Sequence, residues 1–322
     1  MMKHIFILNP VAGTGKAEKR ILPRIIEAVG QDGVDYEIHR TINVGDAKKY
    51  VRKRCESYGD RILRFYAVGG DGTLNEVANG AYGFPNAEIG FIPAGTGNDF
   101  SRIFTNPKFF LDIKKQIKGS SMSIDLIKYD DSFIVNMLNI GLDCSVVKEM
   151  DMIKRRFHIG GPLAYMAGVG VVFASNRGFP LKVILDSGKT FEGEFTLVAV
   201  GNGAYCGGGF KGVPKAEIDD GLMDVSLIYK VNRRTFAALI GKYRKGTHLT
   251  SPLAKNRIKY VKSRSLTVEP ADGMDICVDG EVYSSGKLEL SIAPSAIEFS
   301  IPLGCEIKKD PYASNRRKHN DI

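Results

Sequence analysis

Apolar and polar positions alternate with two different periods in the first third of the chain. Four short segments have the composition of strands: residues 5–8, 36–40, 62–68 and 89–92. Helical spacing is expected at residues 16–29, 46–58, 73–79 and 109–117, and Gly80 is expected to close the third of these helices. Strands that alternate with helices predict a parallel sheet covered by helices, so residues 1–123 are predicted to form an α/β domain.

The pattern changes beyond residue 123. Strands separated by turn residues are expected at residues 124–129, 132–140, 181–185, 190–201, 223–229, 265–269, 275–278, 287–293 and 296–301. Asp130-Asp131 and Asp186-Ser187-Gly188 have the composition of hairpin turns. Residues 124–296 are therefore predicted to form an antiparallel β-sandwich, interrupted by an apolar helix at 162–175 and a basic amphipathic helix at 232–245. The polar segment from Lys308 onward is expected to fray.

The loop Gly69–Thr73, with the sequence GGDGT, joins the 62–68 strand to the 73–79 helix. Glycines at such a turn leave backbone N–H groups accessible, and the helix dipole favours an anion such as phosphate there. A carboxylate at Asp71 would repel phosphate unless a cation lay between them, which indicates Mg²⁺ bound to a nucleotide. The alternative is a tight turn in which Asp71 only caps the helix.

Two further loops have the same character. Pro93–Asp99 follows the 89–92 strand, and Asn9–Lys16 follows the 5–8 strand. Because ligands of open α/β sheets bind at the carboxyl ends of the strands, three such loops predict a nucleotide-phosphate site. A P-loop does not fit, since Pro10 stands where its first glycine belongs and Ala17 follows Lys16. No strand–helix junction carries the G-x-G-x-x-G spacing of a dinucleotide site.

These loops together resemble the diacylglycerol kinase catalytic-domain family, which includes bacterial soluble lipid kinases and the sphingosine kinases. The resemblance rests on GGDGTLNEVANG at Gly69–Gly80, PAGTGNDFSR at Pro93–Arg102 and Asn9-Pro10 with its following glycines, and it extends to Asp219–Val225 and Val278–Glu281. NAD kinases and phosphofructokinases share a GGDG-type loop, but its pairing with PAGTGND favours the lipid kinases. The family's architecture implies an α/β nucleotide domain and a β-sandwich, with residues 297–322 returning to the first domain.

The resemblance implies an ATP-dependent lipid kinase with ATP and Mg²⁺ as cofactors and diacylglycerol, converted to phosphatidic acid, as the leading acceptor. Glu281 matches the family's proton acceptor, Asp71 is expected to bind the nucleotide magnesium, and Asp99 to orient Glu281 through water. Nucleotide contacts are expected at Asn9, Pro10, Gly13, Thr41, Gly69, Gly70, Gly72, Thr73, Glu76 and Thr96. From the residues alone, Asp279-Gly280 is also a good hairpin turn with a merely solvated Glu281, and this alternative stays open.

Asp219-Asp220-Gly221 is a turn by its local chemistry. The resemblance implies a second, structural Mg²⁺ here, with the Asp220 side chain and backbone oxygens of Glu217 and Leu222 as ligands. Glu217 also has a carboxylate, so whether it would bind through its side chain or its backbone stays open. The alternative is an ordinary charged hairpin.

The composition of the chain bears on its cellular compartment. No apolar run reaches the ~20 residues that cross a bilayer, and the apolar N-terminus is too short for a signal peptide. The five cysteines are scattered and the five histidines form no cluster, which predicts reduced thiols, no zinc site and a cytoplasmic protein.

The net charge of +9 is concentrated between Lys230 and Arg264, where eleven Lys or Arg and no Asp or Glu occur. Such a patch attracts polyanions, and without an aromatic nucleic-acid motif we expect an anionic membrane surface rather than nucleic acid. The protein is therefore expected to be cytoplasmic and peripherally associated with membranes. A merely solvated patch is the alternative, and a homodimer stays open.

Other functions remain to be separated from the leading one. The same fold could phosphorylate another lipid alcohol, sphingosine-like or phosphatidylglycerol-like, or a soluble polyol. A non-catalytic nucleotide- or membrane-binding protein is a different class of function. The presence of Asp71, Asp99 and Glu281 argues against it, because a protein without catalysis could lose any of them.

Overall fold

The computed structural model describes residues 2–142, 144, 146, 178–271, 273–279 and 281–308. The helix predicted at residues 162–175 and the tail beyond Lys308 lie outside these residues. In chain order the first unit consists of β1 (Lys3–Leu8), α1 (Ala12–Gly15), α2 (Ala17–Asp32), β2 (Tyr36–Arg40), α3 (Asp46–Ser57), β3 (Leu63–Gly69), α4 (Asp71–Ala81), β4 (Ala87–Pro93), the 3-10 turns η1 (Phe100–Ile103) and η2 (Pro107–Leu111), and α5 (Ile113–Ile117).

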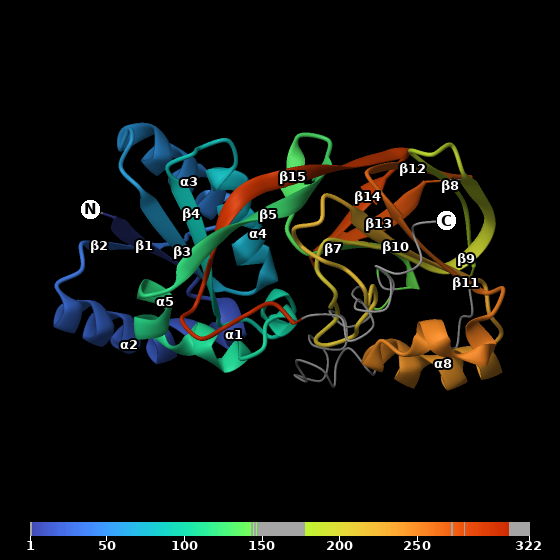
Figure 1. The fold of residues 1–322 in the computed structure, drawn as a ribbon, viewed down its shortest axis with the longest axis horizontal. Coiled ribbons are helices and arrows are strands. Elements are labelled where there is room, and N and C mark those ends of the chain that lie inside the picture. The colour runs from blue at the N-terminus through green and yellow to red at the C-terminus, as the bar shows by residue number, and fades with distance from the viewer. Residues whose placement is uncertain are drawn as a thin grey trace, which may run out of the picture.

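The first unit has a parallel sheet with helices on both faces (Figure 1). The strands lie in the order β4-β3-β1-β2, and all three pairings are parallel. Successive side chains of β1 alternate between the faces: Ile5 and Ile7 pack in the core with α3 and α4, whereas Phe6 and Leu8 pack in the core with α2. Both faces of the sheet are thus covered by helices, as a parallel sheet requires, and the predicted α/β arrangement is confirmed.

Two details of the helices differ from the prediction. Gly80 lies inside α4, which ends at Ala81, instead of closing it. A Cβ there would lie 2.6 Å from the Lys48 carbonyl oxygen in α3. The glycine is thus required by close packing between the two helices. The helix expected at 109–117 is divided into η2 and α5, because Asp112 adopts an extended backbone and its side chain accepts the Lys115 N–H as an N-cap.

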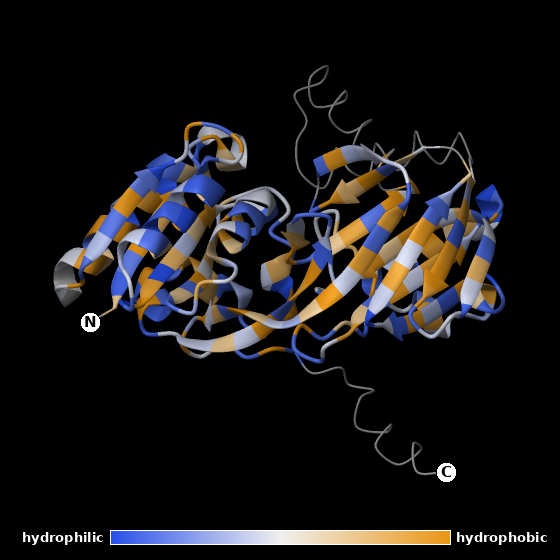
Figure 2. Cartoon of the chain, turned by 90° about the horizontal axis from the view of Figure 1, so that it is seen from above, coloured by the Kyte–Doolittle hydropathy of each residue, from blue (hydrophilic) through white to orange (hydrophobic). Residues whose placement is uncertain are grey.

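The second unit is an antiparallel β-sandwich, as predicted. Its elements are β5 (Ser120–Tyr129), β6 (Ser132–Ile134), β7 (Met137–Gly141), β8 (Phe179–Leu185), β9 (Thr190–Gly201), β10 (Met223–Tyr229), α8 (Arg233–Lys245), the turns η3 (His248–Thr250) and η4 (Pro252–Ala254), β11 (Ile258–Ser263), β12 (Ser265–Pro270), β13 (Met274–Val278), β14 (Glu281–Ser285) and β15 (Leu288–Ile301). Apolar and polar residues alternate along its strands in Figure 2. The apolar side chains form a second core around Phe195, Val198 and Leu227.

Several strands of this unit differ from the sequence pattern. The strand expected at 132–140 is divided at Asn136, whose carbonyl oxygen accepts the N–H groups of Asn202 and Gly203 (both 2.9 Å). The segments at 287–293 and 296–301 form one strand, β15, with a bulge where Ser295 has a φ of 48°. The prediction missed β11 and β14.

Strand β15 connects the two units. Its end pairs in parallel with β4, Phe299 opposite Ile89, and its beginning pairs with β12 and β5 in the sandwich. The domain boundary expected at residue 123 falls inside β5, which pairs with β15 along most of its length. The sheet therefore runs from one unit into the other, as the long red and green strands of Figure 1 show.

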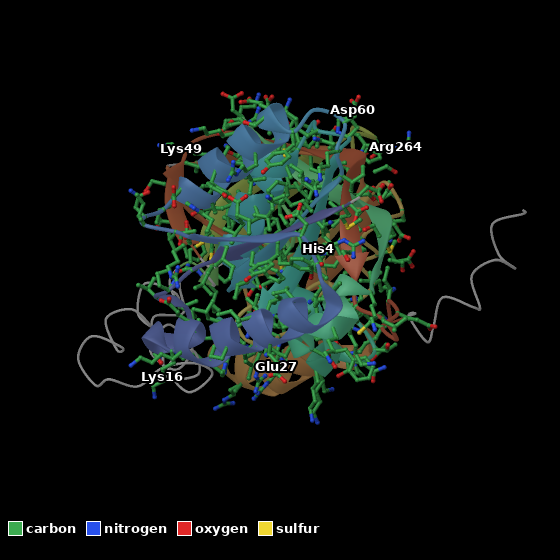
Figure 3. All side chains as sticks on the ribbon, turned by 90° about the vertical axis from the view of Figure 1, so that its left-hand side faces the viewer. His4, Lys16, Glu27, Lys49, Asp60 and Arg264 are labelled. Carbon is green, nitrogen blue, oxygen red and sulfur yellow. The ribbon has the colours of Figure 1, made fainter. Side chains whose placement is uncertain are left out.

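Charged side chains surround the buried sheet of the first unit. Figure 3 shows Lys49 and Asp60 at its rim and His4 inside. His4 is buried and bonds through Nδ1 to the Tyr66 hydroxyl (2.8 Å), and its burial lowers the pKa of its imidazole to about 4. Among the described residues, no helix is both long enough and apolar enough to cross a membrane.

Candidate active site

The three glycine-containing loops meet at one edge of the parallel sheet, where β1, β3 and β4 end. They pack so closely that side chains would collide: a Cβ on Gly13 would lie 2.4 Å from the Ala94 carbonyl oxygen, and a Cβ on Gly95 would lie 2.5 Å from Gly70 Cα. Gly13 also has a φ of 58°, in the left-handed region that favours glycine. The glycines therefore let three backbones converge, which leaves a cradle for a ligand at the N-terminus of α4.

Several side chains expected to contact the nucleotide also hold the loops together. Asn9 Nδ2 donates to Thr73 Oγ1 (3.1 Å), which ties the loop after β1 to α4. Glu76 Oε1 accepts the Gly45 N–H (2.9 Å), which fixes the loop that follows Thr41. Among the other predicted contacts, Gly69, Gly70 and Gly72 line the same turn, Pro10 begins the first loop, and Thr96 is exposed on the third.

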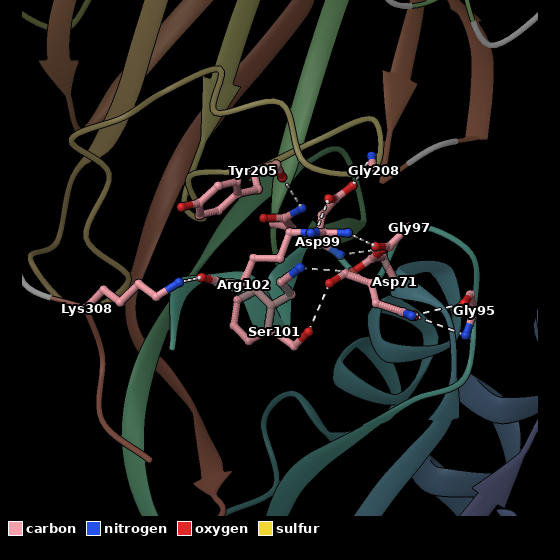
Figure 4. A network of polar contacts seen from close by, with 12 residues as sticks. Asp71, Gly95, Gly97, Asp99, Ser101, Arg102, Tyr205, Gly208 and Lys308 are labelled. Atoms are coloured by element: carbon pink, nitrogen blue, oxygen red, sulfur yellow. Dashed lines mark hydrogen bonds and ion pairs between the residues drawn. The ribbon is translucent and has the colours of Figure 1, made fainter. Parts of the chain in front are cut away.

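Asp71 and Asp99 lie side by side between the loops (Figure 4). Asp71 does not cap its own helix by a side-chain bond; its two oxygens accept the N–H groups of Asp99 (3.0 Å) and Phe100 (3.1 Å). A Cβ on Gly97 would lie 3.2 Å from Asp71 Oδ2 and 3.3 Å from Asp99 Oδ2, so the absence of a side chain at Gly97 leaves room beside both carboxylates.

Asp99 is held from both units. Arg102 Nε donates to Asp99 Oδ1 (3.0 Å), and the Gly208 N–H, from a glycine loop of the sandwich unit, donates to Asp99 Oδ2 (2.8 Å). Arg102 also donates to the Gly97 carbonyl oxygen (3.0 Å). Sequence analysis assigned no role to Arg102 or Gly208, although Arg102 ends the PAGTGNDFSR motif.

The electrostatics of this pair favour a bound cation. Burial raises the pKa of Asp71, and burial together with the Asp71 charge raises the pKa of Asp99 to about 6. No group of three His, Cys, Asp or Glu that could hold a metal occurs within the described ranges. Each oxygen of the two carboxylates accepts an N–H group and keeps a further lone pair. The pair would thus suit a nucleotide-bound Mg²⁺, which takes one or two carboxylates and completes its shell with phosphate oxygens and water.

Glu281 reaches this site from far along the sequence. The hairpin of β13 and β14 places Glu281 Oε1 3.5 Å from the position of a Cβ on Gly72, at the start of α4. Its other oxygen, Oε2, accepts the Tyr283 hydroxyl (2.5 Å). The structure thus brings Glu281 together with the GGDGT loop, and its role as a proton acceptor stays a prediction.

Asp279 is a further acidic residue of the site, which sequence analysis considered only as a turn residue. Its Oδ1 accepts the Met137 N–H (3.0 Å), and it has a φ of 46°, which Asp tolerates better than most residues. Burial raises the pKa of its carboxyl to about 8, and the charges of Asp71 and Asp99 contribute to this rise. The sequence feature that could have identified Asp279 as a site residue is its position two residues before Glu281.

The Asp220 turn lies apart from these loops. Asp220 Oδ1 accepts the Leu222 N–H (3.0 Å), Asp220 Oδ2 binds Lys262, and Lys262 also lies 3.2 Å from the buried Asp224. Glu217 is exposed. Asp125, which sequence analysis did not single out, is 2% exposed and accepts the N–H groups of Gly221 and Ser295 (both 2.7 Å). The structural Mg²⁺ expected at Asp220, Glu217 and Leu222 stays a prediction.

We expect Asp220→Ala to remove the magnesium-dependent rise in melting temperature of the nucleotide-free protein. The variant also loses the pair with Lys262, so the quantity to compare is the shift on adding Mg²⁺ and not the melting temperature itself. Lys262→Met is the matched control, because it breaks the same pair and keeps the carboxylate. A wild-type melting temperature that does not respond to Mg²⁺ would make this an ordinary turn.

Comparison with known proteins finds relatives along nearly the whole chain. Residues 3–129 match the family model of the diacylglycerol kinase catalytic domain, and residues 136–301 match that of the YegS C-terminal NAD kinase beta sandwich-like domain. A diacylglycerol kinase of Staphylococcus epidermidis is 30% identical over 284 residues, which are 88% of this chain and 86% of that protein. A probable lipid kinase YegS-like of Pseudomonas aeruginosa is 29% identical over 292 residues, which are 89% of this chain and 91% of that protein.

A solved structure shares the fold. The crystal structure of a diacylglycerol kinase from Bacillus anthracis superposes with a TM-score of 0.66 at 26% identity, covering 92% of this chain and 96% of that one.

Proposed function

Since this chain belongs to the diacylglycerol kinase catalytic-domain family of lipid kinases, we propose that it transfers the γ-phosphate of ATP to a lipid hydroxyl, with diacylglycerol as the acceptor. The observation that carries the proposal is the position of Glu281. Its Oε1 lies beside Gly72, at the glycine turn that begins α4 and whose backbone N–H groups would face a phosphate there. A base, a phosphate cradle and two buried carboxylates are the parts that phosphoryl transfer requires.

The chain's own groups have separate roles in this reaction. The glycine loops and the N-terminus of α4 would hold the phosphates, Asp71 would hold the nucleotide's Mg²⁺, and Asp99 beside it would orient Glu281 through water or add a second carboxylate to the metal. The metal, when bound, neutralises charge on the transferred phosphoryl group. Glu281 Oε1 accepts the proton of the acceptor hydroxyl as the hydroxyl oxygen bonds to the γ-phosphorus and ADP leaves.

An apolar cavity in the sandwich unit supports a lipid acceptor over a soluble polyol. Its enclosed volume is about 40 Å³, and the pocket is partly open to solvent. The lining comes from the sandwich and from the inner face of α8: Leu142, Thr196, Leu197, Phe210, Ile228, Val231, Phe236, Leu239, Ile240, Tyr243, His248 and Ile258. Burial lowers the pKa of His248 to about 4, so this ring is neutral near pH 7 and the lining carries no charge. The apolar lining favours an acyl chain over a polyol, because burying apolar surface stabilises the chain, and the pocket would have to widen to take it.

ATP consumption tests the proposed function directly. The purified protein should consume ATP in the presence of diacylglycerol in mixed micelles and release ADP and phosphatidic acid. Parallel assays with sphingosine, phosphatidylglycerol and glycerol separate the alternative acceptors. ATP consumption that no lipid stimulates would contradict the proposal, and ATP binding without turnover would indicate a non-catalytic protein.

We further propose that α8 docks on an anionic membrane. The helix buries Leu239 and Tyr243 against the sandwich, while Arg233, Arg234 and Lys245 are exposed on its outer side. Three more exposed cations follow in the acid-free stretch: Lys255, Arg257 and Lys259. Each cation near an anionic surface contributes ~1 kcal/mol, and the attraction decays within a Debye length.

We expect binding to anionic vesicles to weaken steeply with salt and binding to neutral vesicles to be weak. Reversing the charges of Arg233, Arg234 and Lys245 should lower activity on vesicle-bound diacylglycerol by about tenfold or more, and spare activity on a short-chain soluble diacylglycerol. Reversal of three exposed cations of α3, Lys49, Arg52 and Lys53, is the matched control. Equal losses on both substrates would mean that the α8 cations serve folding or catalysis.

A further inference from the structure

The two carboxylate oxygens of Glu281 have different surroundings. Oε1 faces the GGDGT turn at Gly72. Oε2 accepts a hydrogen bond from the hydroxyl of Tyr283, two residues along the same strand. Residues i and i+2 of a strand point to the same face, so the strand itself brings the two side chains together. The bond occupies one oxygen and leaves the other directed at the phosphate loop.

The backbone of this hairpin is fixed near Glu281. Asp279 N donates to the Met137 carbonyl oxygen (3.1 Å), and Met137 N donates back to Asp279 Oδ1 (3.0 Å). This pair extends the ladder between β13 and β7 by one residue, with Val278 opposite Leu138. The side chain of Glu281 is nevertheless exposed, so backbone pairing alone does not choose its rotamer.

The Tyr283 hydroxyl is suited to remain a donor. Burial, followed by the hydrogen bond to Glu281, raises the pKa of this hydroxyl, which therefore keeps its proton at physiological pH. The Tyr283 side chain is 45% exposed, so little of the core depends on it. The hydrogen bond from Tyr283 therefore bears on the orientation of the Glu281 side chain and contributes little to the stability of the fold.

We propose that Tyr283 is a positioning residue that holds Oε2 of Glu281 and thereby presents Oε1 to the acceptor hydroxyl. The proposal rests on the proposed kinase function. In the transfer step the acceptor proton passes to Oε1, while Tyr283 keeps its own proton throughout. Tyr283 acts only through Glu281, so its effect should vanish when Glu281 can no longer accept a proton.

The test is a double-mutant cycle with Tyr283→Phe and Glu281→Gln. Tyr283→Phe should lower kcat for diacylglycerol about tenfold, because a hydrogen bond to a charged group is lost, with KM for ATP unchanged. In the Glu281→Gln background, Tyr283→Phe should cause no further loss. Tyr36→Phe, at an exposed tyrosine of β2, is the matched control.

Three kinetic results would overturn the proposal: a kcat within twofold of wild type, a raised KM for ATP, or an additive loss in the double variant. A readout without turnover separates it from the proposed function. In protein with ¹³C-labelled tyrosine, the Tyr283 ring resonance, assigned by its absence in Tyr283→Phe, should shift in Glu281→Ala, which removes the acceptor oxygen. An unmoved resonance would refute the contact, whereas an inactive wild type with a shifted resonance would refute only the kinase function.

Discussion

Replacing Asp71 with asparagine is expected to lower the rate of phosphoryl transfer by about 10²-fold or more in a protein that still folds. The carboxylate lies between two glycine loops, and under the proposed function its charge would attract the nucleotide's Mg²⁺. A metal ion supplies several kcal/mol of charge stabilisation in the transition state, and each ~1.4 kcal/mol corresponds to a factor of ten in rate. The measurement is the initial rate with saturating ATP, Mg²⁺ and diacylglycerol.

The fold should survive this change, although one local bond is lost. Asp71 accepts the N–H groups of Asp99 and Phe100, and asparagine keeps only one acceptor oxygen for them. Circular dichroism and ADP binding would detect a collapse of the loop. Asp60→Asn, at an exposed carboxylate on the rim of the same unit (Figure 3), is the control and should leave the rate unchanged. Near-normal turnover of Asp71→Asn would remove Asp71 from the metal–ATP chemistry.

Glu281→Gln is expected to lower kcat by ~10²–10⁴-fold, the range that a positioned general base contributes. Glutamine has nearly the same shape and can still accept the Tyr283 hydroxyl through its carbonyl oxygen, but it cannot take up a proton near neutral pH. The affinity for ADP, measured by calorimetry, should stay within a factor of about two, because the side chain lies beside the phosphate loop and donates nothing to it.

A matched control for this variant lies in the same sandwich unit. Glu289→Gln changes a carboxylate of β15 that is 70% exposed and paired with Lys287, and it should leave kcat unchanged. A loss of ADP affinity in Glu281→Gln without a loss of kcat would assign Glu281 to nucleotide binding instead.

Much of the architecture could be predicted because local patterns there agreed with tertiary packing. The strands of the first unit are short apolar runs buried on both faces, and the helices between them carry one apolar stripe. Predictions failed where contacts distant in sequence decide the backbone. Gly80 continues α4, where α3 packs against it, and Asn136 interrupts a strand because its carbonyl bonds to residues 202 and 203.

The candidate site divides in the same way. Glycines at strand ends, and acids next to them, are local features, so Asp71, Asp99 and the phosphate loops could be proposed before any fold was known. Glu281 could be named only through a family resemblance, because a carboxylate after a hairpin turn is ordinary by itself. No sequence pattern marked Tyr283 or Gly208. The contact of Tyr283 with Glu281 depends on side-chain rotamers, and Gly208 donates to Asp99 in the other unit.

By itself, the sequence determined the alternation of helices and strands, the three glycine loops and the acid-free basic stretch, all of which depend on neighbouring residues. Only the tertiary structure decided which groups meet. It brings Glu281 to Gly72, gives Asp99 a donor from Gly208, and forms a small apolar pocket beneath α8. The physical reason is that strand pairing and burial act between segments up to about two hundred residues apart. The hydrophobic periodicity of a segment shows which of its faces is apolar, but not which other segment covers that face.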